Sequence, residues 1–189
     1  MRLSGVFLLI ALAACGSSPT SSFYTLSPDT TLERLSTTVP LRVSVGPVTV
    51  PELVDKPQIV TRRAPNEVSI NEFARWGEPV KENIARTLAA DMSRLLGSDN
   101  VSIYPQGADV KAYAVRVDVM RFDSTPADSV TLDALWTIRA PDGASRFDGH
   151  TVVHKQTTGD GFDAIAAAHS RAVSEMSKQI AAAIVQMRH

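Results

Sequence analysis

The chain has 189 residues, of which 44% are hydrophobic and 21% charged, and its 19 basic and 20 acidic residues give a formal net charge of -1. This composition describes one ordinary globular domain. The near-neutral balance has no basic cluster, which excludes binding to a nucleic-acid backbone. A single cysteine excludes an intrachain disulfide, a cysteine-rich zinc site and a redox cysteine pair.

Residues 1–14 are typical of a secretory signal peptide. Arg2 supplies one positive charge, an apolar stretch starts at Val6, and small residues follow. The apolar stretch is shorter than the roughly 20 residues that a membrane-spanning helix needs. We therefore expect this segment to direct export and to be removed.

The only cysteine stands where the signal peptide ends. With the three residues before it, it resembles the bacterial lipobox, whose positions are here Leu12, Ala13, Ala14 and Cys15. The resemblance implies cleavage before Cys15 and a covalent lipid, palmitate included, on its thiol. Gly16, in place of an aspartate, implies the periplasmic face of the outer membrane. The alternatives are a secreted protein with a chance cysteine, or a cysteine buried as a small apolar residue.

Residues 15–22 are predicted to be the lipidated cysteine and a flexible tether, because glycine and serine dominate them. At about 3.5 Å per residue, the chain from 16 to 22 reaches about 25 Å. The globular domain, residues 23–189, is therefore expected to work close to the bilayer.

Ordered structure is expected from residues 23–26. Alternation of apolar and polar residues then predicts strands over 41–45, 48–51, 58–61, 67–70, 101–104, 113–119, 130–138 and 147–155. Gly46 and Pro47 interrupt the pattern between the first two. Turn-forming residues at 63–66 and 141–143 predict hairpins.

Two amphipathic helices are predicted. The first begins after Pro79 and ends at Gly97, with its apolar stripe at Val80, Ile84, Leu88, Met92, Leu95 and Leu96. The second starts at Phe162, after a turn at 159–161, and runs to the C-terminus. The order of elements predicts the α/β class, on the border with α+β. We expect a single domain in which a mixed, largely antiparallel sheet packs with two amphipathic helices.

No catalytic or metal-binding pattern stands out. His150 and His154 are separated by strand-forming residues, and four residues of a strand span about 13 Å, too far for one zinc ion. His169 lies beside the apolar stripe of the last helix and is predicted to pack there. The sequence contains no nucleophile elbow, phosphate loop or dinucleotide turn. We expect no enzyme activity, no metal and no cofactor other than the lipid on Cys15.

Three segments carry a resemblance: Phe-Tyr-Thr-Leu at 23–26, Val-Gly-Pro-Val-Thr-Val-Pro at 45–51 with Gln-Ile-Val-Thr-Arg at 58–62, and Arg-Trp-Gly-Glu-Pro-Val at 75–80. In this order they resemble the PqiC family of ABC-type transport auxiliary lipoproteins. The resemblance implies an outer-membrane lipoprotein that works with an MCE-domain protein in intermembrane lipid transport and supports envelope integrity. It also makes a homo-oligomeric ring plausible, since MCE partners are typically rings.

Trp76, Arg62 and Arg75 are the candidate partner-binding residues, because Trp and Arg are enriched at interface hot spots. The alternative for Trp76 is packing at the start of the first helix, and the two arginines either remain solvated or stack on its ring. Two other functions stay open: a lipoprotein that binds lipid or another hydrophobic ligand in its own groove, and an unrecognised periplasmic enzyme.

Overall fold

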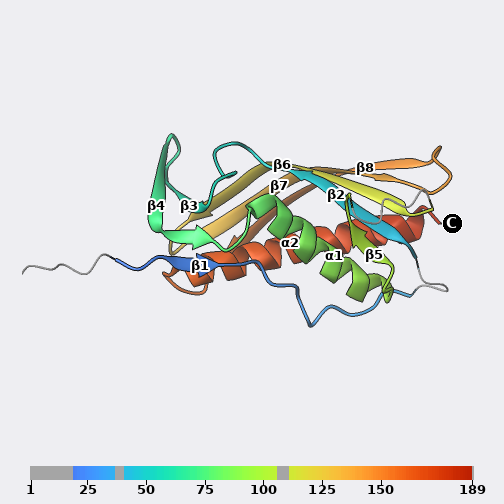
Figure 1. The fold of residues 1–189 in the computed structure, drawn as a ribbon, viewed down its shortest axis with the longest axis horizontal. Helices are drawn as coiled ribbons and strands as arrows, with labels where there is room; N and C mark the ends of the chain where they lie inside the picture. Colours follow the sequence, from blue (N-terminus) through green and yellow to red (C-terminus); the bar gives the residue numbers. More distant parts are fainter. Residues whose placement is uncertain (1–18, 37–40, 106–110, 189) are drawn as a thin grey trace, which may run out of the picture.

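The structure is a computed structural model that describes residues 19–36, 41–105 and 111–188, so the signal peptide and Cys15 lie outside the described residues. Its elements, in chain order, are β1 (Ser22–Tyr24), β2 (Val43–Thr49), β3 (Gln58–Ala64), β4 (Glu67–Trp76), α1 (Val80–Leu96), β5 (Val101–Ile103), β6 (Tyr113–Thr125), β7 (Ser129–Arg139), β8 (Arg146–Gln156) and α2 (Phe162–Gln186) (Figure 1). Both predicted helices and both predicted hairpins are confirmed.

The strands form two sheets, where the sequence predicted one. The larger sheet has five strands in the order β5-β2-β6-β7-β8, and the smaller has three in the order β1-β4-β3. β2 is parallel to β5 and β6, and β1 is parallel to β4, while the remaining pairs are antiparallel. The α/β class and the antiparallel second half are therefore confirmed. β3 and β4 lie outside the larger sheet: they pair with each other, and the other edge of β4 pairs with β1.

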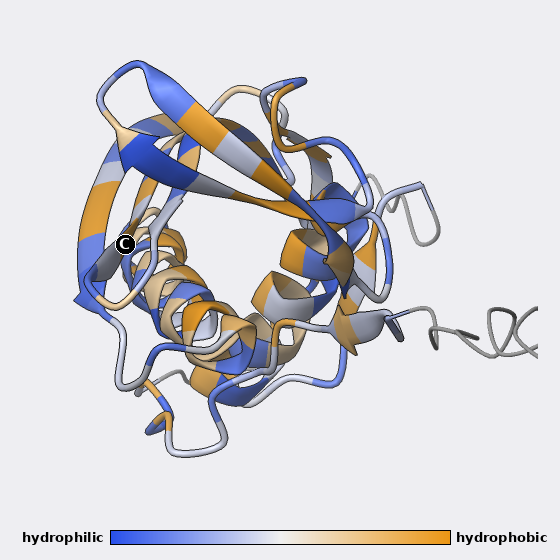
Figure 2. Cartoon of the chain, turned by 90° about the vertical axis from the view of Figure 1, so that its left-hand side faces the viewer, coloured by the Kyte–Doolittle hydropathy of each residue, from blue (hydrophilic) through white to orange (hydrophobic). Residues whose placement is uncertain are grey.

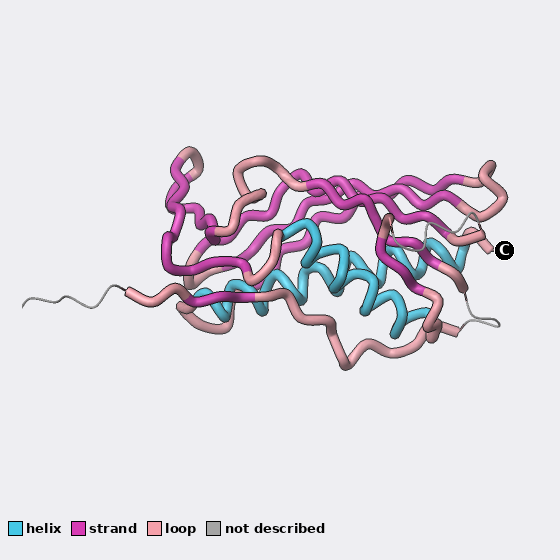
Figure 3. The backbone as a smooth tube through the Cα atoms, viewed as in Figure 1, coloured by secondary structure: helices cyan, strands magenta, loops and turns pink. Residues whose placement is uncertain are grey.

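The two helices lie side by side on one face of the larger sheet (Figure 3). Seen along the long axis of the molecule, the strands curve over both helices (Figure 2). α2 packs against β7 and β8, and α1 packs against β2 and β5. The hydrophobic core lies between these layers.

α1 buries the predicted stripe, since Val80, Ile84, Leu88 and Met92 are all 0% exposed. The helix ends at Gly97, whose φ of 55° is left-handed and favours glycine. α2 buries a face rich in small residues, including Ala168 and Ala172, which lets it lie close to its neighbours. Within the part of the chain that the structure describes, neither helix combines the length and hydropathy of a membrane span.

β6 continues six residues beyond its predicted end at Val119. The register with β7 shifts between Val119 and Arg121, so Met120 and Arg121 are both exposed and the next buried side chain is Phe122. A bulge inserts one residue and reverses the alternation. The sequence pattern therefore ended the strand at the bulge, and it missed the segment that carries Phe122.

Replacing Leu88 with Asp should abolish folding. Leu88 is fully buried in the centre of the α1 stripe, and removing such a side chain alone costs about 2–5 kcal/mol, to which an unpaired buried charge is added. A thermal melt followed by circular dichroism tests this. Ala90→Asp is the matched control, because Ala90 lies on the exposed side of α1. A cooperative melt of Leu88→Asp at the wild-type temperature would contradict the assigned helix face.

Candidate functional site

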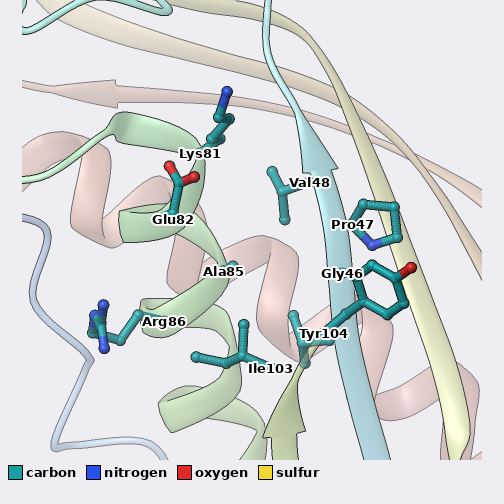
Figure 4. A pocket seen from close by; sticks show the side chains of 10 residues that line it. Gly46, Pro47, Val48, Lys81, Glu82, Ala85, Arg86, Ile103 and Tyr104 are labelled. Atoms are coloured by element: carbon teal, nitrogen blue, oxygen red, sulfur yellow. The ribbon is translucent and has the colours of Figure 1, made fainter. Parts of the chain in front are cut away.

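A cleft lies between the first turns of α1 and the middle of β2. Its volume is about 240 Å³. Figure 4 shows side chains from three elements gathering there: Val48 from β2, Ala85 from α1 and Ile103 from β5. Tyr104 follows β5 at the rim and is 51% exposed. The cleft therefore has an apolar floor and an exposed aromatic side chain at its edge.

The floor is shaped by an irregularity in β2. The predicted interruption at Gly46 and Pro47 does not end the strand, since the pairing with β6 resumes at Val48 after a register shift. Gly46 has a φ of 112°, and a Cβ atom there would lie 3.3 Å from Cβ of Tyr104. The backbone N–H of Tyr104 donates to O of Val45 at 2.8 Å. Glycine thus allows Tyr104 to pack directly over the bulge.

A second hollow of about 450 Å³ adjoins the cleft and shares Lys81 and Glu82 with it. Its wall is the segment from Trp76 to Pro79, facing the loop that precedes β3. The backbone N–H of Trp76 donates to O of Pro57 at 2.7 Å, and that of Gly77 donates to O of Tyr24 at 2.8 Å. These two hydrogen bonds hold β1 and the residue before β3 next to the segment that leads into α1.

Two ion pairs line the rim of the combined cleft. Lys81 Nζ lies 3.1 Å from Asp55 Oδ2, and the hydrogen bond raises the pKa of Lys81. Arg86 binds Glu78 through two nitrogens, with a shortest contact of 2.8 Å, and this interaction raises the pKa of Arg86. The rim therefore carries charges of both signs around an apolar floor.

Trp76 packs inside the protein at the start of α1, which was the alternative to a partner-binding role. It is 5% exposed, and its ring lies 6.0 Å from Phe122 and 6.3 Å from His169 between centroids. An indole buried in this way is not an exposed anchor for a partner. Its contribution to the site is to fix the start of α1.

The two candidate arginines make polar contacts with groups other than Trp76. Arg62 donates to Asp123 Oδ1 at 3.1 Å, which links β3 to β6. Arg75 Nε donates to O of Glu72 at 3.0 Å, and its side chain is 37% exposed. Burial would raise the pKa of Asp123, but hydrogen bonds from Arg62 and Arg121 lower it overall. Arg62 therefore joins the two sheets. Arg75 lies at the surface, where its guanidinium is also 3.7 Å from Glu72 Oε2.

His169 is fully buried, more deeply than the sequence predicted. Its ring stacks on Phe122 with centroids 3.7 Å apart, and its Nε2 lies 2.8 Å from Ser124 Oγ. Nδ1 has no hydrogen-bond partner among the described residues. Burial lowers the pKa of His169 to about 3, against a smaller opposing effect of Asp123. Ser124 is 2% exposed, so this serine–histidine pair is packed inside the core and not presented to a substrate.

His150 and His154 lie on β8 as predicted, at the edge of the larger sheet. His150 Nε2 contacts Asp133 at 2.7 Å, and His154 Nδ1 contacts Thr131 at 2.9 Å. Across the described ranges, no three His, Cys, Asp or Glu side chains are grouped so that they could hold a metal ion.

The sequence analysis missed a buried carboxylate that ties the N-terminal segment to both helices. Asp91 of α1 is 1% exposed and accepts the backbone N–H of Asp29 at 2.9 Å and the hydroxyl of Ser177 of α2 at 3.0 Å. Ser174, also on α2, donates to Asp29 at 3.2 Å. Burial raises the pKa of Asp91 to about 6. The sequence could have indicated this burial, because Asp91 lies three residues after Leu88, on the apolar face of α1.

Comparison with known proteins places the chain by sequence and by fold. The family model described as ABC-type transport auxiliary lipoprotein component matches residues 24–181. A crystal structure of an uncharacterized protein has a TM-score of 0.71 at 20% identity, covering 87% of this chain and 99% of that one. A Xanthomonas campestris protein has a TM-score of 0.65 at 16% identity, covering 88% and 96%. No curated protein matches.

Replacing Gly46 with Ala should destabilise the protein and disturb the cleft. The φ of 112° disfavours any residue with a Cβ atom, and that atom would press on Tyr104. Gly143→Ala is the matched control, because its φ is also positive, at 71°, but nothing lies within 4 Å of the added atom. Urea unfolding should show a loss at least about 1 kcal/mol larger for Gly46→Ala. Equal losses would mean that the contact with Tyr104 is unimportant.

The buried His169 and Asp91 should give opposite pH dependence to stability between about pH 4 and pH 6. Unfolding lets His169 take up a proton, so its contribution to stability falls as pH falls from its unfolded pKa of 6.5 toward 3. Folded Asp91 keeps a proton that the unfolded chain releases above pH 3.8, so its contribution falls as pH rises toward 6. Each group contributes a slope of about 1.4 kcal/mol per pH unit.

His169→Gln should therefore become less stable as pH rises from 4 to 6, and Asp91→Asn should become more stable. Free energies of unfolding from urea titrations at several pH values measure both slopes. Wild-type protein provides the reference, because in it the pH slopes of the unfolding free energy from His169 and Asp91 partly cancel. Slopes that are the same in both variants would show that neither group titrates differently in the folded state.

Proposed function

The chain belongs to the family of ABC-type transport auxiliary lipoproteins, and from this we propose that it is an outer-membrane lipoprotein subunit of an MCE-type intermembrane lipid transport system. In this proposal it is anchored by a lipid on Cys15 at the periplasmic face, docks an MCE-domain protein and supports envelope integrity. It acts by binding, without a catalytic centre or a cofactor.

The observation that supports a docking role is the convergence of the family-like segments on one cleft. Gly46, Pro47 and Val48 line the cleft beside α1. The Trp76–Pro79 segment lines the adjoining hollow, and the hydrogen bond from Gly77 to Tyr24 joins it to the first segment. Residues that are far apart in the sequence therefore build a single surface feature at the start of α1.

The chemistry of the cleft suits a protein partner. Its floor accepts an apolar side chain, and Lys81, Glu82 and Arg86 offer charges to the backbone or flanking residues of a docked segment. Tyrosine is a frequent hot-spot residue, and Tyr104 is half-exposed at the rim. A ring of several subunits would present one such cleft to each subunit of a ring-shaped partner.

The two alternatives have less support. A groove of about 640 Å³ runs between residues 23–31 and α2, but its lining places Asp29, Asp163 and Arg171 beside Phe23, so it offers no continuous apolar channel for an acyl chain. Ser124 and His169, a pair of the kind that some hydrolases use, are buried in the core and not open to a substrate. Docking remains the function that the described residues favour.

The proposal predicts that Tyr104→Asp weakens capture of the MCE-domain protein of the same organism by tenfold or more. A charge at the rim would remove an aromatic contact and leave an unpaired carboxylate in the interface. Val152→Asp is the matched control, because Val152 is 50% exposed on β8, at the opposite edge of the sheet from β5. Capture is measured with purified proteins in detergent.

The lipid anchor is tested separately with the Cys15→Ala variant. This variant should be lost from the outer-membrane fraction but should still capture the partner in solution.

Undiminished capture by the Tyr104→Asp variant would show that the cleft is not the docking surface. No capture by the wild-type protein would contradict the proposed partner.

A further inference from the structure

Two large aromatic side chains stand exposed next to each other on the small sheet. Phe23 of β1 is 66% exposed, and Phe73 of β4 is 47% exposed. Phe23 pairs directly with Arg75, and Phe73 precedes Arg75 by two residues, so all three side chains share one face of the sheet. We call this set, Phe23, Phe73 and Arg75, the Phe23 face.

The fold holds the Phe23 face outward. Ser22 pairs with Ala74, and Tyr24 pairs with Trp76. Ala74 and Trp76 turn to the interior, where they are 2% and 5% exposed, and Tyr24 is half-buried, while Ser22 at the start of β1 is exposed. Because side chains alternate along a strand, burial of Trp76 forces its neighbours Phe23 and Arg75 to the opposite side. The pairing of the strands therefore fixes the exposure of the two phenylalanines.

The same end of the molecule carries further apolar side chains. β4 bends before Phe73, where the side chain of Asn71 accepts the backbone N–H groups of Phe73 and Ala74 at 2.9 and 2.8 Å. The arm of the β3–β4 hairpin beyond the bend holds Val68 and Ile70, which are 36% and 44% exposed. Figure 2 looks onto this end and shows hydrophobic segments along the hairpin and at β1.

Covalent connection limits what can cover this face. Phe23 follows Cys15 by only eight residues, which span at most about 28 Å when fully extended. If Cys15 carries the proposed lipid, the Phe23 face lies within reach of the bilayer to which that lipid belongs. Phe23 is the exposed aromatic of the described residues that is nearest in sequence to Cys15.

We propose that the Phe23 face rests on the lipid surface, with the two phenyl rings in the headgroup region and Arg75 beside the lipid phosphates. Phenylalanine is among the apolar residues that interfacial segments bury at the headgroup boundary, and an arginine guanidinium recognises phosphate oxygens. Arg75 Nε donates to the backbone oxygen of Glu72 at 3.0 Å, and its guanidinium lies 3.7 Å from the exposed Glu72 carboxylate, so a lipid phosphate would compete with that exposed ion pair. This inference rests on the lipid anchor of the proposed function, and it adds a second contact that sets the orientation of the domain.

The test is a tryptophan reporter in the full lipidated protein, purified from membranes and reconstituted into vesicles of phosphatidylethanolamine and phosphatidylglycerol. Phe23→Trp places an indole on the face, and Val152→Trp places one at a similarly exposed site on β8. Native Trp76 and Trp136 are each 5% exposed, so wild-type protein provides the background signal. Lipids with brominated acyl chains should quench the indole of Phe23→Trp at least twofold more strongly than that of Val152→Trp.

A second variant, Phe73→Asp in the Phe23→Trp background, should reduce the quenching severalfold while leaving the melting temperature unchanged, because Phe73 is exposed. It should also capture the MCE-domain protein as well as wild type, which separates this face from the cleft. Flotation with the vesicles without selective quenching would overturn the inference and leave the anchor standing. A blue shift that depends on protein concentration and not on lipid would assign the face to a second copy of the chain. Failure to float would overturn both the anchor and the inference.

Discussion

The indole of Trp76 packs against Phe122 of β6 and near His169 of α2, and through these contacts it joins the small sheet, the large sheet and the second helix. Its backbone N–H is held by Pro57, and α1 begins four residues later. Because the position of this one side chain fixes the first turn of α1, it also fixes the distance between α1 and β2. The cleft depends on that distance, although Trp76 itself is not exposed to a partner.

A second set of buried polar contacts ties the N-terminal segment to the same core. Asp91 and Ser174 hold Asp29, and Ser177 donates to Asp91. Leu26 and Leu32 of that segment are each 5% exposed. A buried carboxylate with hydrogen-bond partners costs less than an unpaired one and specifies a single arrangement of the groups around it. The segment that leads toward Cys15 is therefore part of the folded domain from β1 onward, and the proposed anchor acts on a rigid body.

The sequence predicted what local periodicity determines. The stripe from Val80 to Leu96 defined α1 correctly, and alternation located most strands. Periodicity failed at Met120, where a bulge reverses the alternation, and along β4, where solvent on both sides of the hairpin removes it. The contacts between Ser124 and His169 and between Asp29 and Asp91 join residues 45 and 62 positions apart, so no local pattern reveals them. The division into two sheets depends on such distant pairings as well.

The cleft and the Phe23 face are connected through the alternation of side chains at the end of β4. Arg75 turns outward to the Phe23 face, Trp76 turns inward to the core, and Pro79 lines the hollow beside the cleft, all within five residues. No flexible linker separates the two surfaces, so an orientation imposed at one is transmitted to the other as a rigid-body rotation. A lipid anchor alone would leave the domain free to turn about its tether. A second contact at the Phe23 face would remove that freedom and raise the effective concentration of correctly oriented clefts for the proposed partner.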